Sequence, residues 1–151
     1  MLKFLKEHKI EFAVFSLAVT VRLVFFFVFL HSNGGDLLAT IRGQDGYFQL
    51  SKNLILGNGF SINSTSPFLP YSYGVPGYSY FLFALLWATG SYTAAIMVQI
   101  LLGALVPIIG MYLVRLMLPS FKRIPLVVGI LLALAPYQIL FSFIFYTETL
   151  F

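Results

Sequence analysis

The stretch that decides the fold class is residues 92–114, YTAAIMVQILLGALVPIIGMYLV, which contains no charged residue. A helix rises 1.5 Å per residue, so about 20 apolar residues cross the hydrocarbon core of a bilayer, which is about 30 Å thick. Residues 125–146 also carry no charge, and residues 12–30 carry only Arg22. We therefore predict transmembrane helices at about 10–30, 92–117 and 125–147.

The composition of the whole chain agrees with this class. Of 151 residues, 60% are hydrophobic and 9% are charged, against about 25% charged residues in a soluble domain. These values exclude a soluble domain, a disordered tail and a nucleic-acid-binding module. The chain has no cysteine, which excludes disulfides and thiolate metal sites. We expect an integral, multi-pass membrane protein with membrane lipid as its surroundings and no nucleic-acid partner.

The positions of the basic residues decide how many spans there are. Basic residues concentrate in cytoplasmic loops. Three spans place six of the nine Lys and Arg residues on the cytoplasmic side: Lys3, Lys6, Lys9, Arg115, Lys122 and Arg123. A fourth span at 77–89 would leave only three there. Three spans therefore fit best, with an outer loop at about 31–91.

This outer loop is predicted to contain two helices that lie on the membrane surface. On a helical wheel of residues 45–56, the side chains of Asp45, Gln49, Lys52 and Asn53 fall within one arc of about 100°, as in an interfacial helix with its polar side towards water. Gly57-Asn58-Gly59 should end this helix as a glycine cap. Pro76-Gly77 should open a second helix, which ends before Gly90. The expected fold is all-α, with about three transmembrane helices and a polar pocket between two interfacial helices.

Two acidic residues are candidates for chemistry on the outer face. Asp45 opens the first interfacial helix, either as a general base exposed to the pocket or as a helix N-cap. Glu148 follows the third span, so in the three-span topology it reaches the same face as Asp45. The alternative for Glu148 is a charge that merely ends a helix at the interface.

Three basic residues are candidates for binding a phosphate. Arg22 lies inside the first span, where an arginine costs roughly 2.5–3.5 kcal/mol on insertion scales, and it either serves a site or extends to the interface. Arg42 and Lys52 are the cations of the outer loop, and they either hold a phosphate beside Asp45 or anchor lipid headgroups. The two histidines form no metal-binding motif. Pro107 and Pro136 are expected to kink their helices.

The order of these features resembles the N-terminal part of GT-C fold glycosyltransferases. The motifs are, in order, Arg22-Leu23, the segment Asp45-Gly46-Tyr47-Phe48-Gln49, Gly57-Asn58-Gly59-Phe60, Pro76-Gly77-Tyr78, Gly90 and Thr147-Glu148-Thr149. Together they cover essentially the whole chain. The chain looks most similar to the protein O-mannosyltransferases and to the bacterial enzymes that add aminoarabinose to lipid A or sugars to lipopolysaccharide.

The resemblance implies a transferase that takes a sugar from a polyprenyl-phosphate donor. Such enzymes pass the sugar, with inversion, to a protein, lipid or glycan on the periplasmic or extracellular face of the plasma membrane, or on the lumenal face of the endoplasmic reticulum. Their catalytic acid corresponds to Asp45, and their second acid corresponds to Glu148. Some relatives use a divalent metal ion and others do not, so a metal cofactor stays open.

The chain is shorter than these relatives, which have many more spans. It is therefore expected to be an N-terminal portion that is inactive alone and needs downstream transmembrane segments or a partner subunit. The alternative from another class is a non-catalytic scaffold or a subunit of a lipid-carrier transporter. A transporter would place broken helices and polar groups near the middle of the membrane, whereas here the polar residues concentrate in the outer loop.

Overall fold

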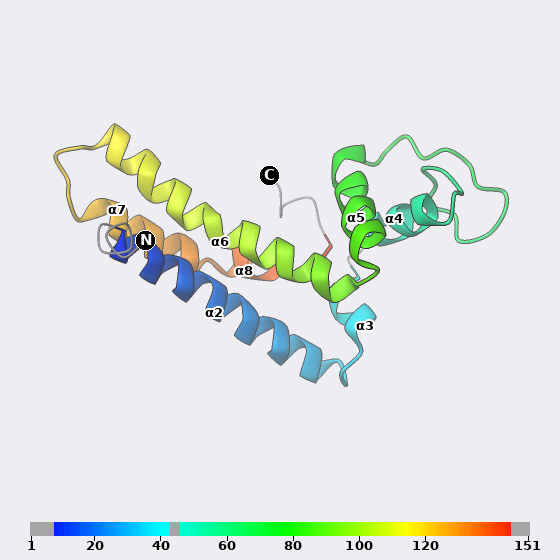
Figure 1. Ribbon diagram of the computed structural model, residues 1–151, viewed down its shortest axis with the longest axis horizontal. Helices are drawn as coiled ribbons and strands as arrows, with labels where there is room; N and C mark the ends of the chain where they lie inside the picture. The colour runs from blue at the N-terminus through cyan, green and yellow to red at the C-terminus, as the bar shows by residue number, and fades with distance from the viewer. Residues whose placement is uncertain (1–7, 43–45, 146–151) are drawn as a thin grey trace.

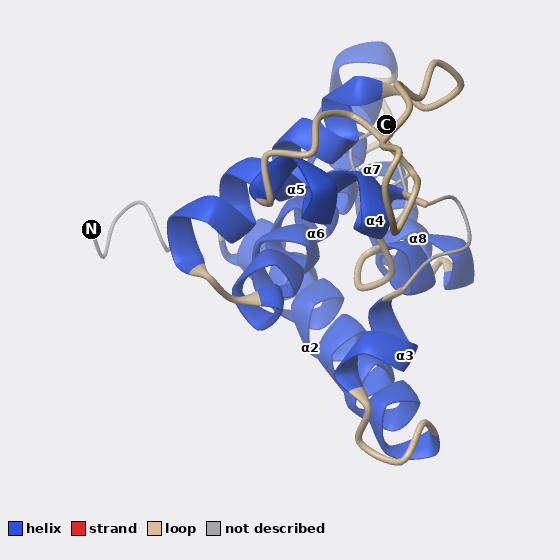
Figure 2. Ribbon diagram, turned by 90° about the vertical axis from the view of Figure 1, so that its right-hand side faces the viewer, coloured by secondary structure: helices blue, strands red, loops and turns tan. Residues whose placement is uncertain are grey.

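The computed structural model describes residues 8–42 and 46–145, and these residues form helices and no strand (Figures 1 and 2). The all-α prediction is therefore confirmed. The helices are α2 (Lys9–Ser32), α3 (Leu37–Ile41), α4 (Tyr47–Ile55), α5 (Pro76–Thr89), α6 (Tyr92–Met117), α7 (Ile124–Ala133) and α8 (Pro136–Phe141).

Helices α2 and α6 are long and apolar enough to cross a membrane, and their bounds match two of the three predicted spans. The two helices run side by side in opposite directions (Figure 1). Helix α2 buries one stripe of side chains spaced four residues apart, including Ala18, Arg22 and Phe26. Helix α6 buries the small residues Gly103 and Ala104, and such residues let helices in a membrane approach closely.

The predicted single helix over 125–147 is wrong within the described part of the chain, because α7 ends at Ala133 and α8 begins at Pro136. Proline has no N–H to donate and disfavours helical geometry in the residue before it. Accordingly, Ala135 is extended, with φ −62° and ψ 119°. Helix α6, by contrast, continues through Pro107. Two described helices, rather than three, therefore meet the length of a membrane span.

The broken segment nevertheless runs the length of the bundle. Helix α7 packs on α6 and α2, and α8 packs on α2. Beyond α8, the N–H of Phe145 donates a hydrogen bond of 2.9 Å to the carbonyl of Ile41 in α3. The segment that starts beside the end of α6 therefore finishes at the base of the loop between α2 and α6.

The two predicted loop helices are present as α4 and α5, which lie beyond one end of the bundle (Figure 1). Helix α4 ends in a Schellman motif: Gly57 has a φ of +75°, and Asn58 N–H donates to Asn53 O over 2.9 Å. Only glycine adopts such a φ without strain. Helix α5 ends at Gly90 in the same left-handed conformation.

The expectation that the polar side of α4 faces water is wrong at Asn53, which is 1% exposed. Its Nδ2 donates to the carbonyls of Ser61, over 2.5 Å, and of Asn63, over 2.8 Å. An amide has two such donor hydrogens, so it satisfies two carbonyls of a chain segment that has no helix or strand. At Asn53, the polar face of α4 thus holds the loop in place instead of meeting solvent, whereas Lys52 on the same face is exposed.

Candidate outer-face site

Three distant parts of the chain meet at the end of the bundle that carries the loop. The ring of Phe145 stacks on Phe48 of α4, with 6.4 Å between ring centres and 18° between planes. It also lies 6.5 Å from the ring of Tyr92, the first residue of α6. With the hydrogen bond to Ile41, these contacts join α3, α4, α6 and the end of the last segment at one point.

The two predicted catalytic acids border this meeting point in sequence. Asp45 and Glu148 themselves lie outside the described residues. The N-cap of α4 is Gly46, whose φ is +77° and whose carbonyl accepts a hydrogen bond of 2.9 Å from the N–H of Leu50. The helix cap that the sequence suggested for Asp45 is therefore occupied by the next residue.

Of the three predicted phosphate ligands, Arg42 lies at the meeting point. It ends α3, its side chain is exposed, and its guanidinium carbon lies 5.9 Å from the centre of the Phe48 ring. This cation–π contact holds the charge beside the ring that Phe145 also covers. Lys52 is exposed on the last turn of α4.

Arg22 lies elsewhere, enclosed in the bundle with 0% exposure. Its Nη1 donates to the carbonyl of Ala18 over 3.0 Å and to that of Ala133 over 3.4 Å. Ala133 is the last residue of α7, where the break before Pro136 frees carbonyls from helix bonding. Arg22 thus faces protein rather than extending to the interface, and its contacts are not with Arg42 or Lys52.

The surroundings of Arg22 do not balance the burial of its charge. Its Nε and Nη2 have no hydrogen-bond partner among the described residues. On the opposite helix, a side chain at Gly103 would place its Cβ 3.3 Å from Nε, so glycine makes room for the guanidinium. The two hydrogen bonds from Nη1 to backbone carbonyls offset only part of the several kcal/mol that burial of an ion costs. Stability therefore does not explain why this arginine is present.

A second buried polar contact joins α5 to α6, and it was not among the contacts predicted from the sequence. Nε2 of Gln99 donates to the hydroxyl oxygen of Tyr78 over 2.8 Å, and both side chains are fully buried. Gln99 is a polar residue inside an otherwise apolar span, and such a residue in the sequence indicates a buried polar contact. The contact fixes α5 against the start of α6 and thereby shapes the loop side of the site.

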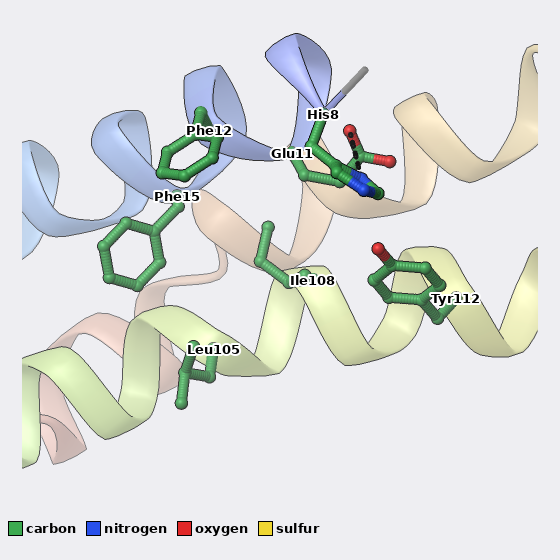
Figure 3. A pocket seen from close by; sticks show the side chains of 7 residues that line it. All are labelled: His8, Glu11, Phe12, Phe15, Leu105, Ile108 and Tyr112. Atoms are coloured by element: carbon green, nitrogen blue, oxygen red, sulfur yellow. Dashed lines mark ion pairs between the residues drawn. The ribbon is translucent and has the colours of Figure 1, made fainter. Parts of the chain in front are cut away.

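The opposite end of the bundle has a groove between α2 and α6 (Figure 3). Its walls are apolar side chains, among them Phe12, Phe15 and Ile108. At its rim, Glu11 accepts a hydrogen bond from Arg115, and Nδ1 of His8 lies 4.0 Å from the carboxylate. This ion pair joins α2 to α6 far from the loop, so the groove is separate from the outer-face site.

No group of three or more His, Asp or Glu side chains gathers within residues 8–42 and 46–145. The described residues thus offer no metal site, and the question of a metal stays with Asp45 and Glu148. No family model, curated protein or solved structure matches the chain.

The packing around Arg22 leads to a prediction about stability. Arg22→Met removes a buried charge and keeps much of the volume, so the free energy of unfolding should stay the same or rise, by up to about 4 kcal/mol. Phe26→Ala, in the same buried stripe, is the positive control and should cost about 3–5 kcal/mol. Unfolding in detergent micelles measures both. A loss of about 3 kcal/mol or more in Arg22→Met would instead make Arg22 a structural cap of α7.

Proposed function

We propose that this chain is the N-terminal part of a membrane glycosyltransferase with a GT-C type of membrane domain. It transfers a sugar from a polyprenyl-phosphate donor to a protein, lipid or glycan acceptor on the outer face, with inversion. Asp45 acts as the general base and Glu148 completes the site. The chain alone is inactive and works together with downstream transmembrane segments or a partner subunit.

The contact between Phe48 and Phe145 carries the proposal. Asp45 lies three residues before Phe48, and Glu148 lies three residues after Phe145. Because the two rings stack, each acid is separated by a short length of chain from one shared point, although 103 residues separate the acids in sequence. This is the arrangement that two acids serving one active site require.

The same point suits a phosphate leaving group. The polyprenyl phosphate leaves as a weakly basic anion, so it does not need a general acid. The reaction then needs a general base for the acceptor hydroxyl and a cation to stabilise the charge of the phosphate. The exposed guanidinium of Arg42 lies against the Phe48 ring. Arg42 is therefore the first candidate for the phosphate, and Lys52, exposed on the last turn of α4, is the second. Arg22 would contribute only after a rearrangement that opens the bundle.

The proposal includes a third crossing of the membrane by residues 124–145. Neither α7 nor α8 is long enough alone. Together they lead from the end of α6 to Ile41, which follows the opposite end of α2. At the break, Ala133 is buried and its carbonyl accepts a hydrogen bond from Arg22, whereas Leu134 and Pro136 are exposed. A broken helix is tolerated in a membrane where its freed backbone groups are satisfied within the protein.

One observation favours the rival function, a subunit of a lipid-carrier transporter. Transporters place discontinuous helices and charged groups near the middle of the membrane. The break between α7 and α8 lies beside the buried guanidinium of Arg22, and this is such a feature. A transporter function would need neither Asp45 nor Glu148. Mutation of these two acids therefore distinguishes the transporter from the glycosyltransferase.

Topology is tested with single cysteines, since the chain has none of its own. Ser66 and Ser120 are both exposed. In intact cells, Ser66→Cys should react with a membrane-impermeant maleimide, and Ser120→Cys should react only after permeabilisation. An alkaline phosphatase fused after Phe151 should be active on the outer side. A fusion that reports the same side as Ser120 would remove the third crossing and separate Asp45 from Glu148.

Catalysis is tested by transfer of radiolabelled sugar from a polyprenyl-phosphate donor, in membranes that contain the protein at its natural length. Asp45→Asn should lower transfer about 10²–10⁴-fold, the usual contribution of a general base, while donor binding stays near normal. The matched control is Asp36→Asn on the same loop. Asp36 caps α3 by accepting N–H groups of Leu38 and Ala39, and asparagine caps equally well.

The control should keep transfer within a few-fold of the unchanged protein. Equal activities of Asp45→Asn and Asp36→Asn would reject the catalytic role of Asp45. A third result would favour the transporter: no variant transfers sugar, and the Asp45→Asn protein still moves the lipid-linked donor across the membrane.

A further inference from the structure

A pocket of about 260 Å³ lies at the end of the bundle opposite the loop, where the chain turns from α6 into α7. It is separate from the outer-face site and from the groove of Figure 3. The residues that line it are Arg115, Leu118, Pro119, Phe121, Lys122 and Pro125.

The pocket is positively charged without a compensating acid of its own. Glu11 and Asp36 are the acids within the described residues. Asp36 caps α3 at the other end of the bundle, and Glu11 is already paired with Arg115. The charge of Lys122, and that of the adjacent exposed Arg123, therefore has no acidic partner within residues 8–42 and 46–145.

The same region exposes apolar side chains. Leu118 and Phe121 line the pocket and are 42% and 55% exposed. On the last turn of α6, Leu116 and Met117 are exposed as well. Cations next to exposed apolar side chains match a ligand with an anionic head and hydrocarbon chains. A free phosphate would gain nothing from the apolar part.

We propose that this pocket binds the headgroup of an anionic phospholipid. Lys122 and Arg115 contact the phosphodiester, and Leu118 and Phe121 contact the first part of an acyl chain. Basic residues next to a membrane helix attract such lipids, and each is worth about fivefold in local lipid concentration. Arg115 is fixed for this role, because its guanidinium is held by Glu11 and lies 5.4 Å from the ring centre of Tyr112.

The test uses a tryptophan in the pocket. The chain has one tryptophan, Trp87 of α5, at the far end of the molecule. Trp87→Phe with Phe121→Trp gives a local reporter in phosphatidylcholine vesicles. Brominated phosphatidylglycerol should quench it more strongly than brominated phosphatidylcholine at the same mole fraction. Lys122→Gln should reduce this preference about fivefold. Lys9→Gln removes a charge at the same end without touching the pocket and should leave the preference unchanged.

Three outcomes would overturn the proposal. The first is equal quenching by the two lipids, and the second is an equal loss of the lipid preference in Lys9→Gln and Lys122→Gln. The third is relief of quenching by millimolar inorganic phosphate, which would indicate a simple anion site.

The chain without the tryptophan substitutions gives an independent check. Native mass spectrometry from mixed-lipid nanodiscs should show retained phosphatidylglycerol, and Lys122→Gln with Arg123→Gln should lose it. Unchanged retention in that double variant would also reject the site.

Discussion

The hydrogen bond from the Phe145 N–H to the Ile41 carbonyl, together with the Phe48–Phe145 stack, is the constraint on which the loop end of the molecule depends. It fixes where the last segment finishes relative to the loop. Without it, the short helices α7 and α8 would have no defined end point, and Phe48 at the start of α4 would keep its contact with Tyr92 but lose the stacked ring of Phe145. Ile41 and Phe145 are both buried, so their backbone hydrogen bond lies in surroundings of low dielectric constant that strengthen it.

The polar side chains lie in three separate places: at the loop end, at the opposite end of the bundle, and between the two. The loop end gathers aromatic rings, the exposed Arg42 and the sequence neighbours of both candidate acids. The other end gathers the Glu11–Arg115 pair and the exposed Lys122. Between them lies Arg22, whose partly unpartnered guanidinium marks the break between α7 and α8. The proposed sugar transfer is placed at the loop end because Arg42 and the sequence neighbours of Asp45 and Glu148 meet there.

The sequence predicted the helices well, because their signals are local. Apolar length defined α2 and α6, and left-handed glycines at Gly57 and Gly90 defined where the loop helices end. The break at Pro136 was signalled only as a kink, since whether a proline bends or ends a helix depends on what satisfies the freed carbonyls. Here Arg22, from a helix more than 100 residues away, contacts one of them.

The site was less predictable, for the same physical reason. Asn53 has the helical position of a solvent-facing residue, and only the return of the loop over it explains its burial. The approach of Phe145 to Ile41 joins residues with no shared periodicity, so no pattern in the sequence indicates it. The roles of Asp45 and Glu148 came from the ordered resemblance to GT-C enzymes, and they stay a proposal that the contacts of their neighbours support.

The most direct measurement of the central claim is chemical cross-linking between positions 45 and 148 in the membrane. The cysteine-free chain allows Asp45→Cys and Glu148→Cys to be paired without background. A short bis-maleimide should link this pair within one polypeptide, while Asp45→Cys paired with Ser120→Cys should remain unlinked. Failure of the 45–148 pair under conditions in which each cysteine reacts singly would contradict the account, because the two acids would then not share a site.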